Sequence, residues 1–219
     1  MKKKIKFYSV DTSTDILKPA PALRFIPRWY RSIPGVRDGV MSVKKCVPVL
    51  DAFSAGYIVP LPADVVWDKA SGRMLTQSRI SLESDHHKSQ IEGFDVGDGY
   101  DPTPHKWLNP WFIKVPRGYS VLFTHPLNRE DLPFKAFTGV VDCDKHPMPV
   151  NFPFVFKEGF EGTVPAGTPM IQLIPFKRET WFSKIVDTGK SYSYEKGYEV
   201  LLPPFKWYKR NFWTRKKYQ

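Results

Sequence analysis

Large apolar side chains stand at every second position in one stretch of the chain, and this alternation limits the possible folds more than any other feature. The four residues are Val150, Phe152, Phe154 and Phe156. Successive side chains of a β-strand point to opposite faces of its sheet, so these four groups would share one face. The stretch therefore predicts a core β-strand.

The distribution of proline favours β structure in the rest of the chain as well. The 219 residues contain 21 Pro and 14 Gly over their whole length, beside 7 Trp, 10 Tyr and 16 Phe. Each X-Pro step disfavours helix, and so much aromatic surface excludes a disordered low-complexity chain. We predict a mainly β protein, folded as one domain without internal repeats.

Short strands joined by turns are expected through most of the chain. Strand composition occurs at residues 43–50, 55–61, 107–115, 119–124, 150–156 and 170–174. Glycines favour hairpin turns at 70–72 and 96–99, and Pro-x-Gly turns at 116–118 and 165–168. The polar stretch 67–100 is expected to form a loop or an active surface. Apolar spacing typical of a helix occurs only at 204–217.

Three parts are expected along the chain. Residues 1–42 are predicted to form an extended, irregular N-terminal arm, because residues 18–35 alone contain four prolines. Residues 43–204 form the expected β-rich core, and residues 205–219 form a short basic, aromatic helix or tail.

The net charge of +11 is concentrated at the two ends of the chain. Residues 2–6 contain four lysines, and residues 205–219 contain six Lys and Arg, with no acid in either segment. The body between them is nearly neutral. We therefore expect the two ends to be where partners bind.

Cysteine content and the N-terminus indicate the compartment. Cys46 and Cys143 lack the spacing of disulfide or zinc motifs, which favours a reducing environment. The basic N-terminus continues into Asp11 and Asp15 without the apolar segment of a signal peptide. No apolar run reaches the roughly 18–20 residues that cross a bilayer. A cytoplasmic protein without a transmembrane segment is expected.

Two motifs follow one another in residues 115–176. A strand, a Pro-x-Gly turn and a second strand precede Gly139-Val-Val-Asp142, and a second Pro-x-Gly turn leads into Gly167-Thr-Pro-Met-Ile-Gln-Leu173. This order resembles the dUTPase and dCTP deaminase superfamily. The resemblance implies a dUTPase-like β-clip barrel or sandwich, and a homo-oligomer, since that superfamily commonly forms trimers.

The same resemblance implies a role for Asp142, which falls where the superfamily's aspartate acts as general base on water. Hydrolysis also needs phosphate-binding groups and usually Mg²⁺. Here the phosphate-contacting Arg-Ser-Gly segment is replaced by Thr124-His125-Pro126, and the base-stacking tyrosine by Lys145. The glycine-rich C-terminal motif has no counterpart. These departures favour a degenerate, non-enzymatic relative.

Three further segments are similar to an uncharacterised family that occurs in bacteriophages and marine bacteria. They are Arg24-Phe-Ile-Pro-Arg-Trp-Tyr30, Lys44-Lys-Cys-Val-Pro-Val-Leu-Asp51 and Phe123-Thr-His-Pro-Leu-Asn128. This resemblance implies a viral origin and, for a phage protein, a location in the host cytoplasm.

Histidines and acids supply the candidate sites. Asp142 and His125 are the candidate catalytic residues, and His86, His87 and Asp144 are the candidate metal ligands. No cofactor is required, although a divalent metal could bind. The alternative is that the histidines are solvated loop residues. Asp142 and Asp144 could share a strand face, but the many turn formers around them favour a turn.

The C-terminal segment interleaves cations with aromatics, a pattern that suits nucleic acid because cations neutralise phosphates and rings stack on bases. The same pattern suits docking on the body, insertion into a neighbouring subunit, or a membrane surface, and docking or assembly is favoured. The candidate partner-binding residues are Lys206, Trp207, Lys209, Arg210, Trp213, Arg215, Lys216 and Lys217.

Two functions of different classes are open at this point. The first is a non-enzymatic, phage-type assembly or binding protein whose β body oligomerises. The second is a nucleotide-binding protein, hydrolase or metalloenzyme with a pocket around Asp142, His125 and His87. The missing phosphate-binding and base-stacking residues favour the first.

Overall fold

The computed structural model describes residues 3–10, 16–185 and 207–219. The chain divides into two compact units. The first unit comprises residues 1–26, 52–178 and 218–219, and the second comprises residues 27–51 and 179–217. The expected three-part division stays a prediction: its boundary after residue 42 falls inside the second unit, and its boundary after residue 204 lies outside the described residues.

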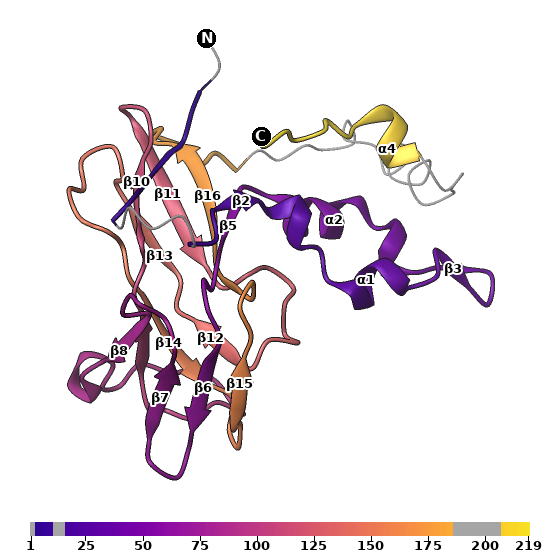
Figure 1. Cartoon of the computed structure of the whole chain (residues 1–219). Coiled ribbons are helices and arrows are strands. Elements are labelled where there is room, and N and C mark those ends of the chain that lie inside the picture. Colours follow the sequence, from indigo (N-terminus) through magenta and orange to yellow (C-terminus); the bar gives the residue numbers. More distant parts are fainter. Residues whose placement is uncertain (1–2, 11–15, 186–206) are drawn as a thin grey trace. The chain divides into compact units, whose positions relative to one another are not determined.

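Antiparallel β-sheets build the first unit (Figure 1). The largest sheet has the order β13-β11-β16-β5-β2. Its strands are β2 Ala20–Pro21, β5 Tyr57–Pro60, β11 Tyr119–Thr124, β13 Gly139–Val141 and β16 Pro169–Lys177. The next sheet has the order β12-β14-β9-β8. Its strands are β8 Glu83–Asp85, β9 His105–Trp107, β12 Phe134–Ala136 and β14 Phe152–Phe156.

Two smaller sheets complete this unit. One contains β15 Gly162–Val164, β6 Val65–Asp68 and β7 Arg73–Thr76, and the other pairs β1 Lys6–Ser9 with β10 Trp111–Lys114. Two short 3₁₀ helices, η1 Ala22–Phe25 and η3 Lys88–Gln90, lie in the connections. The prediction of a mainly β protein is confirmed.

The alternating stretch forms the predicted core strand, β14. Phe152, Phe154 and Phe156 are each at most 2 % exposed, and the Phe154 ring stacks on Trp107 with centroids 4.1 Å apart and planes at 10°. Val155, on the opposite face of the strand, is also fully buried. The sequence pattern predicted burial of one face only. Because both faces of β14 are buried, the strand lies inside the packed core.

Both Pro-x-Gly turns form as predicted. In the first, the Tyr119 backbone N–H donates to the Pro116 carbonyl oxygen at 3.1 Å, and Gly118 has φ 83°. In the second, Thr168 donates to the Pro165 carbonyl at 3.1 Å, and Gly167 has φ 81°. A positive φ at the third turn position is the conformation that glycine adopts without strain.

The strand predicted at 43–50 is wrong. This segment contains a 3₁₀ turn, η2 Val43–Lys45, and the start of a helix, α2 Val47–Ser54. Proline in the first helical turn removes no intrahelical hydrogen bond, so Pro48 does not oppose this helix. The C-terminal end of α2 is fixed by Gln172 of β16, whose buried amide nitrogen donates to the Ala52 and Ala55 carbonyls at 2.9 and 2.7 Å.

Two further expectations also need correction. The single strand predicted at 107–115 is two strands, β9 and β10, which belong to different sheets. The break is made by Asn109, whose side chain exchanges hydrogen bonds with the backbone of Trp111 at 2.9 and 3.1 Å. Residues 96–99 form no tight hairpin, because they lie within the long connection 86–104 between β8 and β9. The hairpin turn at 70–72 is confirmed between β6 and β7.

The described residues of the second unit, 27–51, 179–185 and 207–217, form short helices and a small hairpin. The elements among them are α1 Arg28–Ser32, β3 Val36–Arg37, β4 Val40–Met41, η2, most of α2 and α4 Trp207–Asn211. The predicted C-terminal helix is thus five residues long within the described part of the chain. Among the described residues, no helix is both long and apolar enough to cross a membrane.

Candidate functional site

The candidate catalytic residue Asp142 lies in a turn directly after β13. The backbone N–H groups of Lys145 and His146 both donate to the Asp142 carbonyl oxygen, at 2.8 and 2.9 Å. Asp142 and Asp144 therefore belong to a turn, as favoured from the sequence, and they do not share a strand face. Their two carboxylates nevertheless bind one common partner.

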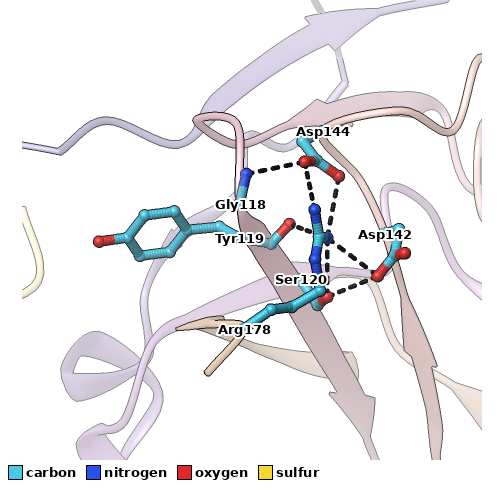
Figure 2. A network of polar contacts seen from close by, with 6 residues as sticks. All are labelled: Gly118, Tyr119, Ser120, Asp142, Asp144 and Arg178. Atoms are coloured by element: carbon cyan, nitrogen blue, oxygen red, sulfur yellow. Dashed lines mark hydrogen bonds and ion pairs between the residues drawn. The ribbon is translucent and has the colours of Figure 1, made fainter. Parts of the chain in front are cut away.

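That partner is Arg178, the residue that follows β16 (Figure 2). Its Nη1 lies 3.0 Å from Asp142 Oδ1 and 3.0 Å from Asp144 Oδ1, and its Nη2 lies 2.5 Å from Asp144 Oδ2. Nη1 also donates to the Tyr119 carbonyl oxygen at 2.8 Å. One guanidinium thus joins the turn after β13 to the start of β11.

Two further donors complete this network, one from β11 and one from the turn before it. We call the network the arginine clamp, and it consists of Gly118, Ser120, Asp142, Asp144 and Arg178. The Ser120 hydroxyl donates to Asp142 Oδ1 at 2.6 Å, and the Gly118 N–H donates to Asp144 Oδ2 at 2.9 Å. The Asp144 side chain is 2 % exposed, whereas that of Asp142 is half exposed. Of the two carboxylates, that of Asp144 is therefore buried among donors, and that of Asp142 faces solvent.

The clamp shifts the acidity of both carboxyl groups in the same direction. Hydrogen bonding from Arg178 lowers the pKa of Asp144 well below its usual range. The hydroxyl of Ser120, together with Arg178, lowers the pKa of Asp142. A carboxylate with a lowered pKa holds a proton weakly, which makes it a poorer general base.

We expect Asp144 to make stability depend on pH. Because its pKa is lowered in the folded state, its stabilising effect is complete above the ordinary pKa of Asp, about 3.9, and is lost as pH falls below that value. The midpoint temperature of wild-type protein, measured by calorimetry between pH 5 and pH 2, should fall more steeply than that of Asp144→Asn.

A second variant and a control make this test specific. Arg178→Ala should also flatten the pH dependence, since it removes the group that lowers the Asp144 pKa. Asp98→Asn, which removes an exposed carboxylate, should leave the steep dependence unchanged. Equal slopes for wild type and Asp144→Asn would mean that the clamp does not hold an ionised Asp144.

His125, the second candidate catalytic residue, lies at the other end of β11. Ser120 and His125 are five residues apart along this extended chain, which is about 17 Å. The His125 Nε2 atom faces the Arg129 carbonyl oxygen at 3.2 Å, and its Nδ1 accepts from the Ala136 N–H at 3.3 Å. Burial lowers its pKa. The structure therefore does not bring His125 to the carboxylate of Asp142.

The candidate metal ligands are divided between two places. His86 and His87 lie in the connection between β8 and β9, where His87 Nδ1 accepts from the Ser89 N–H at 3.3 Å and caps η3. Burial and the charge of Lys106 lower the pKa of His86. Asp144 is held in the clamp. Within the described ranges, no three His, Cys, Asp or Glu side chains gather as a metal-binding group.

The basic C-terminal segment folds back onto α2. The Trp213 indole N–H donates to Asp51 Oδ2 at 2.9 Å, and Lys216 Nζ donates to the same oxygen at 2.6 Å. Lys209 Nζ lies 5.6 Å from the centre of the Trp213 ring. Arg210, Arg215 and Lys217 are exposed. Trp207 begins α4, and Lys206 lies outside the described residues.

Arg178, Ser120 and Asp51 were missed from the sequence. Asp51 ends one of the three quoted resemblance segments but had no role assigned to it, and each of the three residues binds a partner far along the chain. A weak signal existed for Arg178 alone, because it lies four residues beyond the strand predicted at 170–174 from the Gln-Leu motif.

Comparison with known proteins adds no assignment at this point. No protein-family model and no curated protein matches the sequence.

Proposed function

We propose that the protein is a non-enzymatic assembly or binding protein of phage type, whose body is a degenerate dUTPase-like β-clip. The proposed fold is supported by the placement of the two motif segments in one sheet, where both pair with the same strand. The Gly139–Val141 strand β13 and the Gln-Leu strand β16 both pair with β11, and they lie on its two sides. The proposed phage origin is supported by the resemblance of three sequence segments.

One observation carries the non-enzymatic part of the proposal: the carboxylate of Asp142 is already engaged. It accepts a hydrogen bond from Ser120 at 2.6 Å and pairs with Arg178 at 3.0 Å. A general base needs a basic oxygen within reach of the water it activates. The alternative enzyme also needs Asp142 and His125 in one pocket. Asp142 binds Ser120 at the start of β11, whereas His125 follows the end of that strand, and this separation argues against a shared pocket.

The proposal also states that copies of this chain assemble with one another. We propose a homo-oligomer, with a trimer as the first candidate. Multi-angle light scattering of the full chain should give a mass of about three times 25.3 kDa. A mass equal to one chain at every concentration would contradict assembly.

A hydrolysis assay tests the non-enzymatic part. Purified protein is incubated with each deoxynucleoside triphosphate and Mg²⁺, and the products are separated by chromatography. We expect no turnover above the rate without protein. Turnover that is abolished by Asp142→Asn but retained by the exposed control Asp98→Asn would overturn the proposal and make Asp142 a catalytic base.

A further inference from the structure

The positive charge of the protein is concentrated in the second unit. Residues 27–51 and 179–217 contain 14 Lys and Arg against 6 Asp and Glu, so this unit carries +8 of the net +11. The cations near the C-terminus are therefore not an isolated tail. They belong to the same unit as basic residues of the N-terminal part of the chain, among them Arg28, Arg37, Lys44 and Lys45.

The same unit exposes large aromatic rings. Trp29 is 43 % exposed, Tyr208 46 % and Phe212 58 %, and the rings of Trp181 and Phe182 are almost fully exposed. The first unit also exposes Tyr8, Phe94 and Phe176, but its core rings, Trp107 and the phenylalanines of β14, are at most 2 % exposed. Several large apolar groups on one small unit mark an interaction surface, because leaving them in water is unfavourable.

Contacts within the second unit hold part of this surface in place. Asp51 binds both Trp213 and Lys216, which fixes the segment after α4 against α2. At α4, the Tyr208 and Phe212 rings lie with centroids 6.5 Å apart and planes at 34°. The exposed cations Lys209 and Arg210 lie between them in sequence. Two neighbouring rings with cations beside them can contact bases and phosphates together.

We infer that the second unit binds single-stranded nucleic acid. Its phosphates would pair with Lys209, Arg210 and Arg215, and its bases would stack on Tyr208 and Phe212. This inference rests on the proposed function in one respect, since it names the partner of a binding protein. Unpaired bases offer ring faces that a duplex keeps stacked inside, which is why the exposed rings favour single strands.

The shape of the segment distinguishes this partner from a membrane. Binding in the plane of a bilayer uses an amphipathic helix with one apolar face and one charged face. The helix α4 has only five residues, and Tyr208, Lys209 and Arg210 are all exposed around it. Exposed cations and rings therefore lie close together on one short segment, as in channels that bind single strands.

The test uses the full chain and fluorescently labelled 20-nucleotide single-stranded DNA and RNA, with binding followed by anisotropy from 50 to 300 mM salt. Each phosphate contact should add about −0.7 to the slope of log K against log salt. The double variant Lys209→Ala/Arg210→Ala should make this slope shallower by about 1.4. The matched control Lys69→Ala/Arg73→Ala removes two exposed cations of the first unit and should change nothing.

The rings are tested separately from the charges. Tyr208→Ala and Phe212→Ala should each weaken binding roughly 5- to 150-fold without changing the salt slope, as expected for lost stacking. Circular dichroism of every variant checks that the fold is intact. Duplex DNA of the same length should bind more weakly than the single strand, and the ring variants should not affect it.

Three outcomes would overturn the inference. They are no binding of single strands at 50 mM salt, equal effects of the test and control variants, and binding only to vesicles that contain phosphatidylserine. None of these depends on the hydrolysis assay. Nucleotide turnover that depends on Asp142 would contradict the proposed non-enzymatic function but would not affect the inference about nucleic-acid binding. Absence of binding to single-stranded nucleic acid would contradict this inference but would leave the proposal of a non-enzymatic assembly protein standing.

Discussion

Phe154→Ala is expected to lower the free energy of unfolding by about 3–5 kcal/mol, the usual cost of removing a large buried ring. Phe154 is fully buried, stacks on Trp107 at 4.1 Å and meets the edges of Phe134 and Phe156 at 5.5 and 5.1 Å. Three elements, β9, β12 and β14, contribute to this cluster, so the cavity cannot close by moving one side chain. Denaturant unfolding measures the effect directly.

Phe182→Ala is the matched control, because the same ring is 91 % exposed at this position. Its effect should stay within about 0.5 kcal/mol, as for most surface substitutions. Thermal unfolding gives a second readout, since 1 kcal/mol corresponds to about 2–4 °C in a chain of this size. A Phe154→Ala variant as stable as Phe182→Ala would mean that β14 is not the core strand.

Gly56→Ala is expected to have the other large effect, because a Cβ atom has no room there. Gly56 lies between α2 and β5 with φ 68°, and an added Cβ would stand 1.9 Å from the Leu173 carbonyl oxygen. That oxygen belongs to the backbone of β16, which pairs with β5 in register Leu173 to Tyr57. Relief of the clash would have to separate these two strands.

Gly72→Ala isolates the cost of the backbone conformation from the cost of the clash. Gly72 has almost the same φ, 66°, but an added Cβ would meet nothing within 4 Å. We expect Gly72→Ala to lose about 1–2 kcal/mol, the penalty of the left-handed region for a residue with a Cβ. Gly56→Ala should lose at least twice as much or fail to fold, and equal losses would show that β5 and β16 are not in close contact there.

Local patterns were sufficient to predict the elements whose side chains alternate or whose turns need glycine. The strand β14 was found because burial on one face follows a period of two residues, and the turns ending in Gly118 and Gly167 were found because only glycine adopts their φ freely. The segment at 43–50 was misread because Val47 and Val49 favour strands locally. The C-terminal end of its helix is held by Gln172, which binds the Ala52 carbonyl from 120 residues away.

Only the part of the candidate site that depends on neighbouring residues was predicted. Asp142 and Asp144 stand two residues apart, and their turn formers are visible in the sequence. Arg178 is 34 residues beyond Asp144, and it arrives there because β11 pairs with β16 in the register Tyr119 to Lys177. Nothing in the local sequence encodes that register. It is set by burial of the strand faces in the assembled sheet.

The sequence by itself determined the fold class, the core strand, the glycine turns and the amount of positive charge. Each of these depends on residues close together in the chain, whose conformational and hydrophobic preferences act locally. Only the tertiary structure decided that Arg178 binds the two aspartates and that Asp51 holds the basic C-terminal segment against α2. Those contacts join residues 34 to 165 positions apart, and they form only after strand pairing and helix packing have brought their backbones together.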